Sequence, residues 1–330
     1  MTSTMRALMG GAGPEWEARD VDVPEPGPGQ IRVRVRAAAV NRADLYMLQG
    51  TYNPRAKTSD LFTAGLEFAG EVDAIGADVR HRTVGDRVMG VTLGSFAPYA
   101  LVDHRHVITV PGSMSWTDAA ALPVALATEH DALAQGGFRL RQSLLVVGAT
   151  SSVGLIGVQL AKAFGASQVI ATTTSDNKAT ALKSVGADVV VNTASENLAE
   201  AVAAVTGGTG ADLTLDHVGG QLFADTFLAT RIGGTVVNVG RLAGAEATID
   251  LNQLSFRRLR VIGTTFSVRT PDELADACAA LTADAVPAME EGRVRAVVDR
   301  VFAFDDAKAA ADHMRSNTAT GKIVLEMPTS

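Results

Sequence analysis

Apolar and polar residues follow one another along this chain in blocks that predict strands and helices in turn. Residues 144–147 form an apolar run, after which Val153, Ile156 and Leu160 recur at helical spacing. This pattern is typical of a buried strand, a tight turn and an amphipathic helix. The turn, residues 148–154 (GATSSVG), consists mostly of small side chains. A helix that begins there points free backbone N–H groups at the turn, which favours binding of a phosphate.

The same rhythm continues for about a hundred residues. Strands are predicted at residues 167–174, 188–192, 211–216, 235–240 and 261–266, with helices at 177–185, 196–205 and 222–228. Strands that are apolar throughout and alternate with helices predict a parallel sheet covered on both faces. We therefore place a doubly wound nucleotide-binding domain at residues 123–265.

The first third of the chain has short strands and many glycines and prolines. Residues 31–37 (IRVRVRA) alternate between apolar residues and arginine, which predicts a half-buried antiparallel strand with its arginines on one solvated face. The 330 residues carry a formal net charge of −7, which argues against a nucleic-acid surface. Residues 1–122 are predicted to form a β-rich domain.

The C-terminal part contains one further helix start and two short strands. Thr270, Pro271 and Glu273 form a capping sequence, with threonine as the cap and glutamate placed to reach back to it. Strands near 297–304 and 321–327 are predicted to return to the N-terminal β-rich domain, with a helix between them. Residues 266–330 would thus complete that domain.

Composition agrees with two globular domains. Hydrophobic residues make up 47% of the chain, yet no segment is apolar enough to predict a membrane span. The first residues lack the apolar run of a secretion signal, and a single cysteine excludes an internal disulfide framework. We therefore expect a cytoplasmic protein.

Six motifs in a fixed order carry a resemblance to a known family. They are AAVNRADLYMLQGTY at 38–52, AGLEFAGEV at 64–72, VGDRVMG at 84–90, ALPVALAT at 121–128, GATSSVG at 148–154 and TGKIVL at 320–325. The chain resembles the zinc-independent quinone oxidoreductases of the medium-chain dehydrogenase/reductase superfamily. The resemblance implies an α/β fold, a Rossmann doubly wound parallel sheet plus a GroES-like β-rich catalytic domain. It also implies a homodimer joined through the Rossmann sheets.

The positions that bind catalytic zinc in other members of this superfamily have changed here. The zinc-dependent alcohol dehydrogenases supply a cysteine and a histidine where this chain has Asn41 and Leu66. Glu67 remains, but a zinc site needs three or more protein ligands. His104 and His106 share a strand face without a third ligand in the sequence. We therefore predict no metal.

Without a metal to polarise a carbonyl group, the acceptor must take up hydride readily. Quinones and alkenes conjugated to a carbonyl group meet this requirement, and both develop negative charge on oxygen that hydrogen-bond donors can stabilise. The predicted function is NADPH-dependent reduction of a quinone. Two alternatives remain open: an enoyl or enone reductase acting on an α,β-unsaturated carbonyl compound or acyl thioester, and a non-catalytic NADPH-binding protein.

The resemblance also assigns the catalytic positions, at a site between the two domains. Six side chains are expected to face the nicotinamide or the acceptor: Asn41, Asp44, Tyr46, Tyr52, Thr128 and His130. Tyr46 or Tyr52 could donate a hydrogen bond to the acceptor oxygen. His130 could relay a proton, or could be an ordinary packed helix histidine. Residues 54–63, rich in turn formers, are predicted to form a loop at the pocket mouth.

The cofactor residues follow from the turn and from the strand after it. The turn offers Gly148, Ala149, Ser151, Ser152, Val153 and Gly154. NAD-binding sheets usually carry an acidic residue about 20 positions later. Thr173 stands there, followed by Ser175 and Lys178, which favours NADPH, whereas Asp176 counts against it.

The family pattern adds three more cofactor residues. His217 lies in a loop that runs beside the cofactor in relatives, and Gly240 approaches the same molecule. Lys322 matches a lysine that can reach the cofactor phosphates. The alternative for Lys322 is a strand-edge lysine that faces water.

Overall fold

A computed structural model describes residues 3–50, 52 and 61–328 of the chain. The chain divides into two units. The β unit comprises residues 1–124, 270–283 and 296–330, and the α/β unit comprises residues 125–269 and 284–295. Most of the loop predicted at 54–63 lies outside the described residues, apart from the short strand β4 (Phe62–Thr63) at its end.

The α/β unit is built on a parallel sheet with the strand order β11-β10-β9-β12-β13-β14. Its strands are β9 (Ser143–Val147), β10 (Gln168–Thr173), β11 (Val189–Asn192), β12 (Ala211–Asp216), β13 (Thr230–Asn238) and β14 (Arg260–Gly263). Numbered along the chain, the order is 3-2-1-4-5-6, which is that of the Rossmann fold. The predicted doubly wound sheet is therefore confirmed, and its order reverses between β9 and β12.

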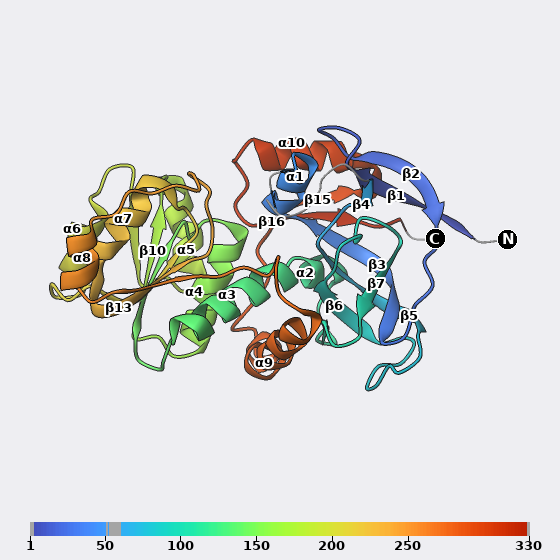
Figure 1. Ribbon diagram of the computed structural model, residues 1–330, viewed down its shortest axis with the longest axis horizontal. Coiled ribbons are helices and arrows are strands. Elements are labelled where there is room, and N and C mark those ends of the chain that lie inside the picture. Colours follow the sequence, from blue (N-terminus) through green and yellow to red (C-terminus); the bar gives the residue numbers. More distant parts are fainter. Residues whose placement is uncertain (1–2, 51, 53–60, 329–330) are drawn as a thin grey trace. The chain divides into compact units, whose positions relative to one another are not determined.

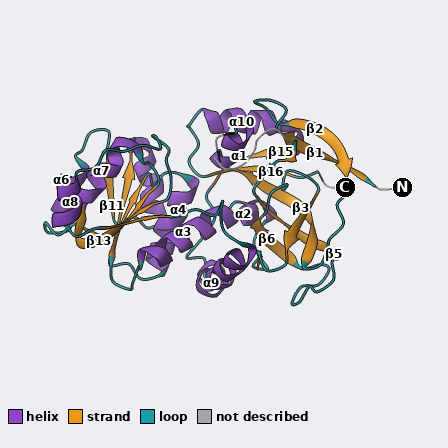
Figure 2. Cartoon of the chain, viewed as in Figure 1, coloured by secondary structure: helices purple, strands orange, loops and turns teal. Residues whose placement is uncertain are grey.

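Helices flank this sheet (Figures 1 and 2). They are α3 (Pro123–Gly136), α4 (Ser152–Ala163), α5 (Ala179–Ser184), α6 (Leu198–Val205), α7 (Gly220–Ala229) and α8 (Leu251–Phe256). The helix predicted at 177–185 instead begins with a 3-10 turn, η1 (Asp176–Lys178). Branched aliphatic side chains from β9, β10 and β11 pack under α6 to form one part of the core.

The β unit contains two sheets. A three-stranded sheet has the order β2-β1-β4, and a larger sheet has the order β15-β16-β3-β5-β6-β8, with β7 also paired to β3. The remaining strands are β1 (Thr4–Gly10), β2 (Glu17–Asp22), β3 (Gln30–Val40), β5 (Glu67–Ile75), β6 (Arg87–Val91), β7 (Tyr99–Asp103), β8 (Val107–Thr109), β15 (Val298–Ala303) and β16 (Lys322–Glu326). Its helices are α1 (Arg42–Leu48), α2 (Trp116–Ala120), α10 (Ala307–Arg315) and the 3-10 turn η2 (Phe304–Asp306).

The arginine-rich strand is half-buried, as predicted. Ile31, Val33 and Val35 of β3 are buried, whereas the alternating arginines lie on the other face. Arg32 pairs with Asp73 and Arg36 pairs with Glu71 on the neighbouring strand β5. Carboxylates of the same sheet therefore partner these two arginines, which gives the stripe a structural explanation.

The C-terminal strands return to the β unit, as predicted, because β16 pairs antiparallel with β3. The predicted boundaries differ from the observed ones by a few residues, since 123–124 lie with the β unit and 266–269 with the α/β unit. Residues 284–295 also lie with the α/β unit. Gln159 of α4 explains this placement. Its side chain donates to the carbonyl of Arg295 and accepts from the backbone N–H of the same residue.

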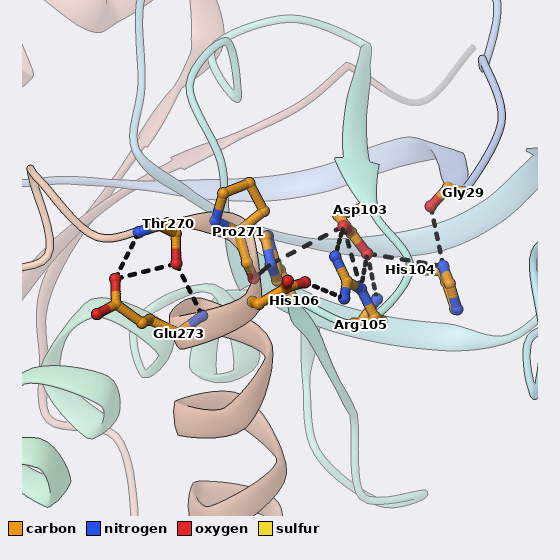
Figure 3. A network of polar contacts seen from close by, with 9 residues as sticks. Gly29, Asp103, His104, Arg105, His106, Thr270, Pro271 and Glu273 are labelled. Atoms are coloured by element: carbon orange, nitrogen blue, oxygen red, sulfur yellow. Dashed lines mark hydrogen bonds and ion pairs between the residues drawn. The ribbon is translucent and has the colours of Figure 1, made fainter.

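The long helix α9 (Pro271–Glu290) begins at the predicted capping sequence, within the β unit. Figure 3 shows the side chain of Glu273 reaching back to the backbone N–H and hydroxyl of Thr270. The backbone N–H of Glu273 in turn donates to the threonine hydroxyl. His106, after β7, contacts the carbonyl of Pro271 through Nε2 at 2.7 Å. The bonds between Thr270 and Glu273 give partners to N–H groups that a helix start would otherwise leave without them.

Candidate functional site

The turn after β9 has the geometry that the sequence predicts for a phosphate-binding turn. Gly148 adopts a φ of 77°, in the left-handed region that favours glycine. Ser151 then caps α4, whose first residues are Ser152, Val153 and Gly154. The N–H groups of the first helical turn lie outside the intrahelical ladder and face the turn. This arrangement suits an anionic group.

Ser151 occupies the position of a glycine in the usual fingerprint, and the structure shows what it does there. Its hydroxyl oxygen accepts a hydrogen bond of 3.0 Å from the N–H of Gly154. A Cβ atom at Gly154 would lie 2.7 Å from the Cα of Ala149, so this glycine lets the helix start close to the strand. Serine thus stabilises the helix start, but the N–H of Gly154 is then no longer free to bind an anion.

His217 and Gly240 lie at the same end of the sheet as this turn. His217 follows β12, and its N–H donates to the carbonyl of Val147 at 3.1 Å, so this histidine lies beside the end of the neighbouring strand β9. A Cβ atom at Gly240 would lie 2.5 Å from the carbonyl oxygen of His217. Ligands of open α/β sheets bind at this edge, where the strand order reverses.

The end of β10 carries the residues that the sequence assigns to the cofactor ribose. Thr173 is buried, and its hydroxyl bonds to the backbone of Ser175 at 3.1 Å. Asp176 accepts a hydrogen bond from Asn192 and is thereby held against β11. Lys178 ends the 3-10 turn.

A cavity of about 330 Å³ opens beside this strand end. Its polar lining consists of Thr173, Asp176, Lys183, Asp188, Asn192 and Glu196. Acidic residues outnumber the single lysine, which disfavours a phosphate group inside this cavity.

In the β unit, Asn41, Glu67 and Lys322 form one buried cluster. The ammonium of Lys322 contacts a carboxylate oxygen of Glu67 and donates to the Oδ1 atom of Asn41 at 2.5 Å. The Nδ2 atom of Asn41 donates to the same glutamate at 2.9 Å. The second carboxylate oxygen accepts from the backbone N–H of Val124 at 2.8 Å. Lys322 is only 2% exposed, so the alternative of a lysine facing water is wrong.

Asp44 lies next to this cluster, on α1. Its Oδ2 atom accepts from the backbone N–H of Asn41 at 2.7 Å. Its Oδ1 atom has no hydrogen-bond partner among the described residues. Burial raises the pKa of Asp44 to about 7, and the nearby charge of Glu67 adds to the rise. The chain therefore holds a carboxyl group that titrates near neutral pH.

The donor set around Glu67 does not fit a zinc ion. Both carboxylate oxygens already accept hydrogen bonds, one of them from an ammonium group, and the neighbouring position is Leu66. Within the described part of the chain, no three histidine, cysteine or acidic side chains come together as a metal site. The histidines at 104 and 106 contact backbone carbonyls of Gly29 and Pro271 (Figure 3).

Three of the predicted catalytic positions are partly accessible. Tyr46 is 37% exposed on α1, and Tyr52 is 36% exposed just after it. Thr128 is half-buried on α3, in the α/β unit.

His130 has a structural environment, which favours the second of its two predicted roles. Its Nε2 atom lies 2.8 Å from a carboxylate oxygen of Asp284. Its ring packs edge-on against Phe164, at 6.1 Å between centroids. Phe164 follows the C-terminal end of α4, roughly 18 Å along the helix from the glycine turn. A packed helix histidine therefore explains these contacts better than a proton relay beside the nicotinamide.

Two buried acids at this end of the sheet were not found from the sequence. Asp216 accepts from the N–H groups of Val218 and Gly219 and shapes the loop after β12. Glu129 is completely buried on α3, beside His217. A glutamate within a helix is ordinarily exposed, and Glu129 is followed by the polar residues His130 and Asp131, so the sequence offered no signal of its burial.

Two family models match the chain. An alcohol dehydrogenase GroES-like domain matches residues 27–112, and a zinc-binding dehydrogenase matches residues 152–283.

None of the helices in the described residues is long and apolar enough to cross a membrane.

Several proteins are similar to this chain over most of its length. The quinone oxidoreductase-like protein 2 of Bos taurus is 30% identical over 87% of this chain and 82% of its own. The quinone oxidoreductase of Pseudomonas aeruginosa is 31% identical, over 95% of this chain and 96% of its own. The 2-methylene-furan-3-one reductase of Solanum lycopersicum is 31% identical, over 88% of this chain and 69% of its own.

Solved structures agree with these relatives. Mycobacterial Rv1454c, solved with NADPH, is 26% identical with a TM-score of 0.84, covering 98% of this chain and 99% of that one. An alcohol dehydrogenase superfamily protein from Novosphingobium aromaticivorans is 27% identical with a TM-score of 0.90, covering 98% and 100%. The chain therefore belongs to the quinone oxidoreductase branch of the medium-chain dehydrogenase/reductase superfamily.

Proposed function

We propose that this oxidoreductase transfers a hydride from NADPH to a quinone without a metal ion. The observation that carries the proposal is the ammonium of Lys322 on Glu67, together with the hydrogen bonds from Asn41 and Val124. These donors bond to the carboxylate of Glu67, which is the residue that this chain retains at the zinc-binding positions. An acceptor that needs no Lewis acid fits this arrangement, and two similar proteins are named for quinone reduction.

The α/β unit supports nicotinamide dinucleotide binding. The N–H groups of Ser152 and Val153 and the positive end of the α4 dipole would hold the pyrophosphate. Ser175 and Lys178 would meet the 2′-phosphate of NADPH, outside the acidic cavity. NADPH is favoured because a similar protein was solved with it and because a neutral threonine ends β10. When bound, this cofactor supplies the hydride.

In this proposal the residues of the chain orient the reactants and stabilise charge. Lys322 would hold Asn41 and Glu67 in place through its buried contacts, which gives it a positioning role rather than a phosphate-binding one. The hydroxyl of Tyr46 or Tyr52 would donate to the acceptor oxygen as negative charge develops. A reduced quinone can take its protons from solvent.

The direct test follows the absorbance of the reduced nicotinamide during turnover. We expect purified protein to oxidise NADPH faster than NADH with benzoquinones or naphthoquinones, and to keep this rate after treatment with a chelator. Lys178→Ala is expected to weaken NADPH use while leaving NADH use unchanged. Loss of activity on chelation would contradict the metal-free proposal, and saturable NADPH binding without turnover on any acceptor would favour a non-catalytic NADPH-binding protein.

Reduction of a conjugated alkene is a second candidate, and Asp44 is the observation that favours it. An enone or enoyl thioester must be protonated at carbon after hydride addition, and a buried acid with a pKa of about 7 is suited to hold that proton. One relative is named as a furanone reductase. We expect Asp44→Asn to abolish any alkene reduction while sparing quinone reduction. Equal loss with both acceptors would argue against this proton role.

We also propose a homodimer, joined at β14. This strand ends the parallel sheet, and large apolar side chains lie exposed on it and near it. Val261 on the strand, Ile232 on β13 and Phe256 on α8 belong to this group, and Phe256 is 82% exposed. Unpaired edge strands and apolar patches favour association. Light scattering on the purified protein measures its mass, and Val261→Asp is expected to shift a dimer towards the monomer.

A further inference from the structure

A buried acid and a buried base meet inside the α/β unit. Glu129 on α3 and His217 after β12 place Oε1 and Nε2 3.1 Å apart. Both side chains are almost completely buried. The two atoms lie at contact distance but off the angle of a hydrogen bond, and neither has another hydrogen-bond partner among the described residues. Buried polar groups without such partners are uncommon and call for an explanation.

The carboxyl group occupies space that a glycine leaves open. A Cβ atom at Gly157, in the middle of α4, would overlap Oε2 of Glu129. No other residue type would leave room for this side chain at its present position. The side chain of Glu129 is therefore part of the packing contact between α3 and α4.

The neighbouring charged residues are directed away from Glu129 and His217 and bond to other groups. His130 and Asp131, the next residues on α3, contact Asp284 and Arg269 instead. Asp216, next to His217, turns its carboxylate to backbone N–H groups. Burial raises the pKa of Glu129 well above its ordinary value and lowers that of His217 to about 4. Burial thus favours the uncharged form of both groups, a carboxylic acid beside a neutral imidazole.

His217 places this pair next to the edge of the sheet where the cofactor is proposed to bind. Its N–H donates to the carbonyl of Val147, and its own carbonyl accepts from the N–H of Leu242. Gly148 and Gly240 both pack closely against it. The histidine thus touches the loops that follow β9, β12 and β13.

We propose that Glu129 is a positioning residue for the dinucleotide cofactor, acting through His217. When protonated and turned slightly toward Nε2, its carboxyl group donates to that atom and holds the loop after β12 against α3, which fixes the residue that Gly148 of the glycine turn packs against. No group is transferred in this step, and a single proton stays within the pair. The inference rests on the proposed binding of NADPH to the α/β unit.

The test compares two replacements of Glu129 by NADPH titration of the full chain. The amide of Glu129→Gln can donate to Nε2 as the acid does, so its Kd is expected to stay within about twofold of wild type. Glu129→Leu leaves the imidazole without a donor and is expected to weaken binding about tenfold, a difference of roughly 1.4 kcal/mol. Gln159→Leu is the matched control. It removes a buried polar side chain of α4 away from His217, and should lower the melting temperature without changing the Kd.

A second readout separates this inference from the proposed function. The ¹⁵N chemical shifts of His217 in the free protein are expected to report a neutral ring at pH 6 in wild type and in Glu129→Gln, with an altered Nε2 shift in Glu129→Leu. A protonated ring in wild type, or a folded Glu129→Leu protein with unchanged Kd, would overturn the inference. Absence of NADPH binding by wild type would reject the proposed function, and the positioning role with it, while the expected shifts would still establish the hydrogen-bonded acid.

Discussion

Both units of this protein contain an acid buried against a base. The two pairs differ in the hydrogen bonds that surround the acid. In the β unit, Glu67 faces the ammonium of Lys322, and both carboxylate oxygens also accept hydrogen bonds from other groups. In the α/β unit, Glu129 faces His217, and neither reactive atom has a hydrogen-bond partner among the residues that the structure describes. Charges removed from water need opposite charge and hydrogen bonds, whereas groups without them give up their charge.

This comparison indicates which chemistry each unit can support. The β unit keeps a fixed cation and anion beside Asp44, a group that titrates near neutral pH. In the α/β unit, burial favours the uncharged form of both members of the pair, under a surface proposed to bind an anionic cofactor. A buried negative charge there would oppose the pyrophosphate, so a neutral acid suits that place.

The largest effect is expected from breaking the charged pair. Lys322→Met leaves Glu67 buried without its cation, and we expect it to lower the free energy of unfolding by about 3–5 kcal/mol. Denaturant unfolding measures this. Arg36→Met, which breaks the partly exposed pair with Glu71 on the same sheet, should cost no more than about 1 kcal/mol. Similar losses in the two variants would show that burial does not distinguish these pairs.

Asp44 should make the stability of the β unit fall as pH rises. Its pKa is about 7 in the folded chain and 3.8 in the reference state, so the folded form retains a proton that the unfolded form has lost. Between about pH 4 and pH 7 the free energy of unfolding should decrease by about 4 kcal/mol from this group. Asp44→Asn should remove that slope in denaturant titrations. A slope of unchanged size would mean that other groups cause it.

His217 should give the α/β unit the opposite dependence. Its pKa falls from 6.5 to about 4 on folding, so the unfolded chain binds a proton in this range and the folded chain does not. This contribution to stability is complete above about pH 6.5, and about 3 kcal/mol is lost as pH falls through 4. His217→Gln is the variant to compare by acid unfolding. If it loses stability as steeply as wild type below pH 6.5, the histidine is not neutral in the folded state.

The smallest effect tests the space beside Glu129. Overpacking by Gly157→Ala should cost about 1–3 kcal/mol, of which helix propensity returns about 1 kcal/mol. In a Glu129→Ala background the same substitution should be stabilising. The sign change in a double-mutant cycle of unfolding free energies is the measurement. Gly263→Ala on β14 is a control, because a Cβ atom there meets nothing within 4 Å.

Much of the fold could be predicted because its signals are local. The strand at 211–216, the capping residues at 270–273 and the small residues at 148–154 each have a short-range physical cause. The same holds for the arginine stripe of β3, whose period of two sets its exposed face. Local periodicity and capping chemistry therefore recover the elements and the turn.

The contacts of the buried polar side chains could not be predicted in this way. Lys322 meets Asn41 and Glu67 only because β16 pairs with β3 next to β5. The sequence left two roles open for His130, and the contact that favours a packed helix histidine comes from Asp284, far along the chain. The burial of Glu129 on α3 was not found from the sequence. Each of these outcomes depends on tertiary packing of segments far apart in the chain.

The glycine at the centre of α4 has a consequence for the history of this sequence. An acid at position 129 is accommodated best with glycine at 157, so the acid is expected to be acquired in a chain that already has this glycine. Once both are present, neither can be exchanged alone without passing through a less stable protein. Related chains with a larger residue at the position of Gly157 are therefore expected to carry a small one in place of Glu129. The two positions should be inherited together.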